Sequence, residues 1–504
     1  MKAKTLMVVG SMSSAGKSLL VTALCRLFSR RGLRVAPYKS QNMSNNAAVC
    51  PDGSEIGRAQ YTQALACGIV PTAEMNPILL KPEADAHSQV VVMGKPWASL
   101  PAREYYLHKT ELWEIATQSL DSLRQVYDLV IIEGAGSPVE LNLKDGDIVN
   151  MSIAKYADSP VLLVGDIDRG GIFAQLLGTL WLFEENEERN LIKGLLINKF
   201  RGDITLFYDG IKILEDKGKV PVIGIIPYTN HHIPEEDAVA IEKQNWKDSK
   251  AGMIDIVIPR LPRIANFDDF DILMREPGVR LRYIDSPTEI GRTDALILPG
   301  TKSTISDLNW LHTQGFVEWI QDFAVKGGSI VGICGGYQML GHLIHDATRI
   351  ESDVRISKGI GLLEIETDFQ GEKATHQMEG IVHCKNGWLS SVAGNTIKGY
   401  EIHMGKTSVN LENALMDITQ RSGNTISQLD GFVSNDGRIW GCYIHGLFEN
   451  HKFRRAWLKS LGWESAPGEE LISLDQSFDQ IADVLEKSLD MTLLEKIIGL
   501  EPQS

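Results

Sequence analysis

The chain has 504 residues, which at roughly 150 residues per domain predicts two to four domains. Hydrophobic residues make up 43% and charged residues 23%, a composition typical of globular proteins with apolar cores. The formal net charge of −15 argues against a nucleic-acid partner, because the phosphates would be repelled. The sequence contains no apolar run of about 18 residues, so we expect no membrane-spanning helix and no membrane partner.

The first residues and the cysteines both indicate a cytoplasmic protein. The apolar run within residues 1–18 is too short for a signal peptide and leads directly into a glycine-rich loop. The cysteines are widely scattered and form no CxxC pair, so we expect reduced thiols rather than a disulfide framework or a metal cluster.

Short β-branched runs alternate with helical patterns along most of the chain, which is typical of parallel α/β architecture. Apolar residues at helical spacing predict a helix over residues 17–30, with Gly32 as its stop. Candidate strands in the first half are residues 5–10, 34–39, 128–134, 160–166, 194–200 and 221–227.

A polar stretch at 241–252 is the best candidate for a linker, because a second α/β series follows it. The strands of that series are expected at 254–260, 279–285, 294–300 and 329–336. Beyond residue 450 the pattern is helical, with a long helix near 475–498. We therefore predict two doubly wound parallel-sheet α/β domains, at 1–240 and 252–450, and a helical tail at 451–504 that packs on one of them.

The sequence GSMSSAGKS follows the first strand and precedes the first helix, as a phosphate-binding loop requires. Backbone N–H groups of such a loop, which here runs from Gly10 to Gly16, converge on phosphate oxygens at a helix N-terminus. Lys17 would neutralise the β- and γ-phosphates of ATP, and the Ser18 hydroxyl would bind Mg²⁺. Five residues rather than four separate the two glycines, and a plain glycine turn is the alternative.

The longer loop resembles the dethiobiotin-synthetase-like branch of phosphate-loop proteins, which activates carboxylates as acyl phosphates. Two further segments are similar to that branch. Glu133 in EGAGS follows a strand and offers Mg²⁺ a hard oxygen ligand. The resemblance implies that Asn198 in INKF reads the adenine ring, although a capping role is the alternative. GDIDRGG (165–171) ends another strand, so Asp166, Asp168 and Arg169 are expected to face the same edge of the sheet. A helix cap with an ion pair is an equally good interpretation of this segment.

Cys334 in SIVGICGGYQML lies between a predicted strand and a helical run, with glycines on both sides. Small neighbours permit a strained turn that exposes the sulfur at a helix N-terminus, which favours the thiolate. A lone cysteine is more often a buried apolar residue. This segment, however, resembles the nucleophile elbow of class I glutamine amidotransferases, so we predict that Cys334 is catalytic.

His445 in GCYIHGLFEN is the predicted base for this thiol, because it ends a strand-like segment downstream of the cysteine. His403 in YEIHMGKT is the nearest rival, and we interpret it as structural or interfacial. Many triad amidotransferases carry Glu two residues after the histidine, where Leu447 stands here, and Glu449 is a weak substitute. Gly300 and Gly335 are the candidates for oxyanion N–H groups.

The combination of these two halves resembles the adenosylcobyric acid synthase family. Its matching segments are KSQNMSNNAAVCPDGSEIGRAQ (39–60), MNPILLKPEAD (75–85), EGAGSPVELNL (133–143) and VGDIDRGGIFAQ (164–175). The resemblance implies that ammonia from glutamine amidates the b, d, e and g carboxylates of adenosylcobyrinic acid a,c-diamide, with ATP and Mg²⁺. We expect Gln41, Asn42, Asn45 and Arg58 near the corrinoid, since amides and arginine suit its carboxylates and amides.

Two alternatives remain open from the sequence. The same chemistry could act on another acceptor, such as cobyrinic acid itself or a cell-wall precursor carboxylate. A protein of a different class would be a nucleotide switch that carries an inactive glutaminase-like domain.

Overall fold

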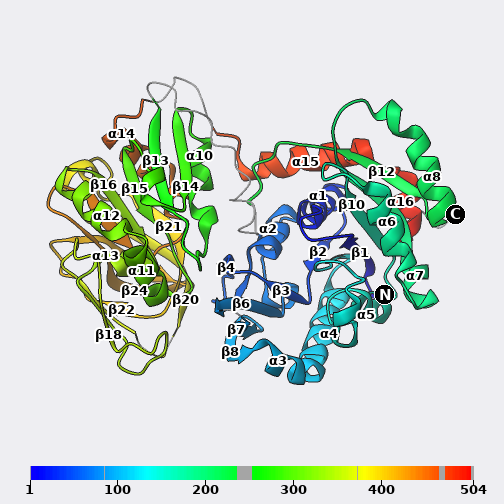
Figure 1. Cartoon of the computed structure of the whole chain (residues 1–504), viewed down its shortest axis with the longest axis horizontal. Coiled ribbons are helices and arrows are strands. Elements are labelled where there is room, and N and C mark those ends of the chain that lie inside the picture. The colour runs from blue at the N-terminus through cyan, green and yellow to red at the C-terminus, as the bar shows by residue number, and fades with distance from the viewer. Residues whose placement is uncertain are drawn as a thin grey trace.

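The computed structural model describes residues 2–84, 86–234, 253–369, 371, 373–464 and 471–500. It forms two α/β lobes, one around a six-stranded sheet and one around a nine-stranded sheet (Figure 1). Within these ranges no helix combines the length and the apolar character needed to cross a bilayer. The predicted linker at 241–252 lies outside the described residues.

The first sheet is entirely parallel, in the order β12-β11-β10-β1-β9-β2. All six strands predicted in the first half form it, and the helix predicted at 17–30 is α1 (Lys17–Arg30). The strands are β1 (Lys4–Gly10), β2 (Val35–Tyr38), β9 (Leu129–Glu133), β10 (Val161–Asp166), β11 (Ile192–Phe200) and β12 (Val222–Pro227).

Alternation along each strand supplies two separate apolar cores for this sheet. Leu6 and Val8 of β1 belong to one core, and Met7 and Val9 belong to the other. The first core also receives α1, and the second receives α4 (Lys109–Val126), α5 (Met151–Ala157), α6 (Ile172–Trp181) and α8 (Tyr208–Gly218). Because helices cover both faces, the strands are buried on both sides. The loops that follow these parallel strands meet at the carboxyl ends of the strands.

Small sheets that the sequence pattern did not predict lie between this sheet and the second lobe (Figure 1). One sheet has the order β3-β6-β7-β8 and the other pairs β4 with β5. The strands are β3 (Gln41–Met43), β4 (Ala47–Val49), β5 (Glu55–Gly57), β6 (Ile78–Ala84), β7 (His87–Val92) and β8 (Lys95–Pro101). Helix α2 (Arg58–Ala66) follows β5, and helix α3 (Ala102–Tyr105) follows β8. Residues of β4 pack with residues of β21 from the second lobe.

The second sheet is mixed, in the order β14-β13-β15-β16-β25-β24-β23-β20-β21. The first five strands are parallel and contain the four predicted strands, whereas the last four are antiparallel. The bounds are β13 (Ile254–Pro259), β14 (Val279–Ile284), β15 (Ala295–Leu298), β16 (Ser329–Ile333), β20 (Ala374–Val382), β21 (Thr396–His403), β23 (Ala414–Arg421), β24 (Asn424–Val433) and β25 (Ile439–Cys442). The predicted parallel pattern is therefore found in the first five strands of this sheet, and four antiparallel strands extend the sheet beyond them.

The residues after 450 divide between the two lobes. Helix α14 (His451–Ser460) buries Trp457 in the core of the second lobe. Helices α15 (Leu474–Ser488) and α16 (Met491–Ile498) instead join the first lobe (Figure 1). There Phe478 of α15 packs in the same apolar core as the buried residues of α1. The single helix expected near 475–498 is therefore two helices, because Asp490 caps a new helix by accepting a hydrogen bond from the Leu493 N–H.

Candidate functional site

The phosphate loop joins the carboxyl end of β1 to α1, which is the edge where ligands bind in open parallel sheets. Gly16 has a φ of 94°, a left-handed conformation that favours glycine. A side chain there would also collide with Asn198. The Asn198 amide donates to the Ala15 carbonyl at 2.8 Å and its oxygen accepts from the Lys199 N–H at 2.9 Å, so it supports the loop.

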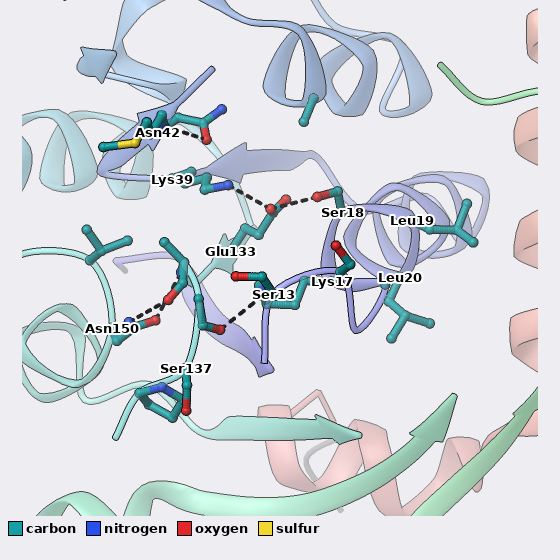
Figure 2. Close-up of a pocket in the computed structure, with 18 of the residues that line it drawn as sticks. Ser13, Lys17, Ser18, Leu19, Leu20, Lys39, Asn42, Glu133, Ser137 and Asn150 are labelled. Carbon is teal, nitrogen blue, oxygen red and sulfur yellow. Dashed lines mark hydrogen bonds and ion pairs between the residues drawn. The ribbon is translucent and has the colours of Figure 1, made fainter. Parts of the chain in front are cut away.

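Glu133 is the centre of the polar network at this edge (Figure 2). Its Oε1 accepts hydrogen bonds from Ser18 Oγ at 2.9 Å and Lys39 Nζ at 3.0 Å, and its Oε2 accepts from Gln63 Nε2 at 2.6 Å. Burial alone would raise the pKa of Glu133, but Lys39, Gln63 and Ser18 hold it below its usual value. An ionised carboxylate beside a hydroxyl is a suitable donor pair for Mg²⁺.

Lys17, the residue before Ser18, is buried at this edge. Its Nζ donates to the carbonyls of Met12 at 3.2 Å and Gly136 at 3.1 Å. Burial, together with the nearby Lys39, lowers the pKa of Lys17 to about 8. The Gly136 contact joins the EGAGS segment to the loop, so the sequence segments predicted to share one site meet here.

The GDIDRGG segment lies at the same edge, at the end of β10. Asp166 is buried and its Oδ2 lies 2.8 Å from Lys199 Nζ. Asp168 pairs with Arg201 at 2.9 Å, and Arg169 lies 3.7 Å from Asp166. This geometry fits the ion-pair interpretation of the segment.

A cavity of about 1730 Å³ opens in front of the phosphate loop. Lys17, Ser18 and Glu133 line one part of it, and residues of the second lobe, including Ile264 and Phe267, line another. Ligand pockets usually measure about 300–1,000 Å³, so this cavity has room for a nucleotide and a second large ligand. The predicted substrate residues Gln41, Asn42 and Asn45 all lie in its wall.

Arg58, the fourth predicted substrate residue, is placed differently. In the described part of the chain the cavity wall does not include it. Its guanidinium is buried against the second lobe, where Nε lies 2.8 Å from Asp268 Oδ2 and Nη2 donates to the Tyr400 hydroxyl. The sequence could not show this, because the segment that carries Arg58 faces the second lobe as well as the cavity.

Cys334 stands on a strained turn between β16 and α13 (Gly335–Leu340). Its φ of 51° and ψ of −110° are unusual for a residue with a side chain and are typical of a functional position. A side chain on Gly336 would collide with the Leu298 carbonyl, so only glycine allows α13 to approach β15 this closely. The turn therefore has the geometry expected of a nucleophile elbow.

His445 follows β25, the parallel neighbour of β16, and its side chain reaches the Cys334 thiol. His445 Nδ1 lies 2.6 Å from Asp269 Oδ2, and the other oxygen of Asp269 accepts from the Gly446 N–H at 2.8 Å. Burial alone would lower the pKa of His445, but Asp269 and Cys334 raise it to about 10. The three side chains form a cysteine–histidine–aspartate arrangement.

The partner of His445 is thus Asp269, whereas the sequence had offered only Glu449, as a weak candidate. Asp269 lies in the NFDDFD segment (266–271), soon after β13, at the carboxyl edge that also carries Cys334 and His445. An acidic cluster after the first strand of a parallel series was the available signal. Asp269 was not predicted, because the acidic partner was expected downstream of the histidine.

The other predicted glutaminase residues are close to this arrangement. Gly300 lies against the side chains of both His445 and Cys334, since a Cβ on it would be 3.0 Å from His445 Cε1 and 3.7 Å from Cys334 Cβ. Gly335 is the first residue of α13. His403 instead stacks on Tyr443 with ring centroids 3.7 Å apart, and its nitrogens contact the Gly405 carbonyl and Glu401.

Comparison with known proteins agrees with this division of the chain. Residues 6–238 match the CobQ/CobB/MinD/ParA nucleotide-binding domain, and residues 255–453 match the CobB/CobQ-like glutamine amidotransferase domain. A cobyric acid synthase of Roseiflexus castenholzii is 54% identical over 96% of both chains, and one of Chloroflexus aurantiacus is 53% identical over 99% of this chain and all of its own. Among solved structures, PurLQS of Thermotoga maritima is 14% identical, with a TM-score of 0.30, over 42% of this chain and 98% of its own. The chain belongs to the cobyric acid synthase family, whose members are glutamine-dependent amidotransferase ligases of cobalamin biosynthesis.

Proposed function

We propose that this enzyme uses ATP, Mg²⁺ and glutamine to amidate the b, d, e and g carboxylates of adenosylcobyrinic acid a,c-diamide, giving adenosylcobyric acid. The observation that carries the proposal is the large cavity between the phosphate loop and the second lobe. It is wide enough for a nucleotide beside a macrocycle, and amide side chains in its wall suit a ligand bearing carboxylates and amides.

Glutamine is hydrolysed at Cys334. The sulfur attacks the side-chain carboxamide carbon, and N–H groups at Gly335 and near Gly300 stabilise the oxyanion. His445, oriented by Asp269, gives its proton to the departing ammonia. The glutamyl group then remains on Cys334 as a thioester. A water molecule then attacks the thioester, transfers a proton to His445 and releases glutamate.

The acceptor is activated at the phosphate loop. Lys17 and the loop N–H groups hold the phosphates of ATP, and Ser18 and Glu133 would hold Mg²⁺. When bound, the metal ion neutralises charge on the transferring phosphoryl group. The described residues contain no cluster of three acidic, histidine or cysteine side chains that could hold a metal ion. Mg²⁺ in such sites is usually bound by one or two carboxylates together with water and substrate phosphates, which Ser18 and Glu133 would fit. An oxygen of the corrinoid carboxylate attacks the γ-phosphorus and ADP leaves. Ammonia then attacks the acyl phosphate and expels phosphate.

An apolar contact between the two lobes lies beside Cys334. Ala47, Val49 and Leu79 of the first lobe pack with Tyr400 and Ile402 of the second, and the Ile402 carbonyl lies 3.5 Å from Cys334 Sγ. We propose that ammonia crosses at this contact, where bulk water is excluded. Because the chain has one phosphate loop and one elbow, the four carboxylates must visit a single activation site in turn.

The acceptor is tested by incubating the enzyme with ATP, Mg²⁺ and glutamine and one of three compounds: the a,c-diamide, cobyrinic acid or a cell-wall precursor. Mass spectrometry should show four successive amide additions on the a,c-diamide alone, with about one ATP consumed for each. Amidation of another compound at an equal or higher rate would replace the proposed acceptor. Absence of glutamine hydrolysis, with or without ATP, together with no amidation of any compound, would favour a nucleotide switch that carries an inactive glutaminase-like domain.

A further inference from the structure

Helix α2 (Arg58–Ala66) contacts the ATP site at one position and residues next to the glutaminase site at another. Gln63 donates to Glu133 Oε2 at 2.6 Å, inside the ATP site. Arg58 lies at the first turn of the same helix and contacts the second lobe. Five residues of helix rise only about 7.5 Å along the axis, so the two contacts belong to one short rigid element. In Figure 1, α2 lies between α1 and the second lobe.

Arg58 reaches the glutaminase through two routes without touching its reacting atoms. It pairs with Asp268, and the next residue is Asp269, which holds His445. It also donates to the hydroxyl of Tyr400, whose ring stacks on the His445 ring with centroids 5.3 Å apart and an interplanar angle of 19°. Tyr400 and His445 exchange backbone hydrogen bonds of 3.1 and 2.8 Å, so their positions are linked.

Arg58 supplies a positive charge next to two buried carboxylates. Asp268 and Asp269 are adjacent buried carboxylates that repel each other. Burial, with a contribution from Asp269, raises the pKa of Asp268 to about 6, and Arg58 opposes this rise more than His445 does. A buried charge that loses its partner is strongly unfavourable, so a movement of Arg58 would disturb the acidic pair that orients His445.

A second buried ion cluster between the lobes provides a comparison. Lys373 of the second lobe lies 2.5 Å from Glu55 of the first, and Glu55 also pairs with Lys81 at 2.5 Å. Lys373 donates to Glu55 and Gln89, and neither of these residues belongs to a catalytic centre. If Lys373 is replaced, Glu55 keeps Lys81, so such a variant loses an interlobe contact but leaves no isolated charge.

We propose that α2 couples the two centres, with Arg58 as a positioning residue, so that ATP–Mg²⁺ at the Glu133 site accelerates glutamine hydrolysis at Cys334. The inference rests on the proposed function, because it takes ATP–Mg²⁺ as the ligand of the first lobe. Its consequence for the reaction is that ammonia is released fastest when the ATP site is occupied.

The test measures glutamate release by the full-length enzyme at saturating glutamine, with and without ATP–Mg²⁺ and with no corrinoid present. In the wild type, ATP–Mg²⁺ should raise kcat about 5-fold or more, within the usual range of coupling between sites. Arg58→Gln should reduce this ratio to about one, with the KM for glutamine nearly unchanged, and Arg58→Lys should restore part of it. Lys373→Met, the matched control, should keep the wild-type ratio.

Tyr400→Phe removes only a hydroxyl and serves as the second variant if Arg58→Gln is unfolded; it should also lower the ratio. A wild type without stimulation, an Arg58→Gln or Tyr400→Phe enzyme with the full ratio, or an equal loss in Lys373→Met would overturn the coupling. Corrinoid amidation with ammonium is measured in parallel in the wild type. Its absence would contradict the proposed function, whereas the glutaminase ratio decides the coupling by itself.

Discussion

Asp269 Oδ2 lies 2.6 Å from His445 Nδ1 although 176 residues separate them in the chain. The nitrogen bonded to the carboxylate must carry a proton, so Asp269 keeps a proton on Nδ1. The other imidazole nitrogen is therefore the one available to Cys334. The second lobe therefore contains a complete triad in which the acidic member precedes the cysteine in sequence.

Replacing Asp269 should change the pH dependence of glutamine hydrolysis. A histidine with a raised pKa keeps its proton to higher pH, so in the wild type the proton needed by the leaving ammonia is lost only as pH rises through about 10. Asp269→Asn removes the nearest negative charge, so the pH at which kcat/KM falls on the alkaline side should decrease by at least ~1 pH unit. Glu449→Gln is the control, and a fall at the same pH in Asp269→Asn and wild type would contradict the assignment.

His445 and His403 should respond differently to substitution. His445→Ala removes the proton donor, which should lower glutamine-dependent amidation at least ~10²-fold and leave activity with high ammonium largely intact. His403→Ala should retain glutamine-dependent activity within a few-fold, because both nitrogens of His403 contact other groups. Comparable losses in the two variants would mean that the base is misidentified.

Lys17 and Glu133 should be needed with either nitrogen source. Lys17→Ala or Glu133→Gln removes charge that stabilises the transferring phosphoryl group or its metal ion, and should reduce amidation at least ~10²–10³-fold. Product formation is measured with glutamine and, separately, with ammonium. Activity within a few-fold of wild type in either variant would refute the role given to that residue.

The docking of α15 on the first lobe gives a stability prediction. Phe478 is 2% exposed and packs in the core of α1, so Phe478→Ala should destabilise this lobe by about 3–5 kcal/mol. Hydrogen exchange of a peptide covering residues 17–30 should become faster, whereas a peptide of β13 should be unaffected. Lys487→Ala, at an exposed position of α15, should change neither rate.

Local patterns predicted much of this structure. The phosphate loop and the cysteine elbow each consist of a strand, a tight turn and a helix that are adjacent in sequence, so residue types and spacing were sufficient. The same holds for the ten predicted strands, whose apolar runs are buried on both faces of parallel sheets. The antiparallel strands at 374–433 are half exposed and carry a weaker apolar signal, which explains why they were not predicted.

The features that sequence could not supply depend on contacts between distant segments. Asp269 becomes a triad member only because β13 and β25 end at the same edge of one sheet. Arg58 was expected near the corrinoid because its segment is polar, yet its side chain is buried against Asp268. The helices after residue 470 and α14 look similar in sequence, and only tertiary packing assigns them to different lobes.

The most direct test of the two-centre account is the Cys334→Ala variant, assayed for corrinoid amidation by mass spectrometry with glutamine and then with a high concentration of ammonium. The account predicts that amidation with glutamine is abolished and that amidation with ammonium continues near the wild-type rate, because the ATP site does not include Cys334. Loss of amidation with both nitrogen sources would contradict the separation of ammonia release from carboxylate activation.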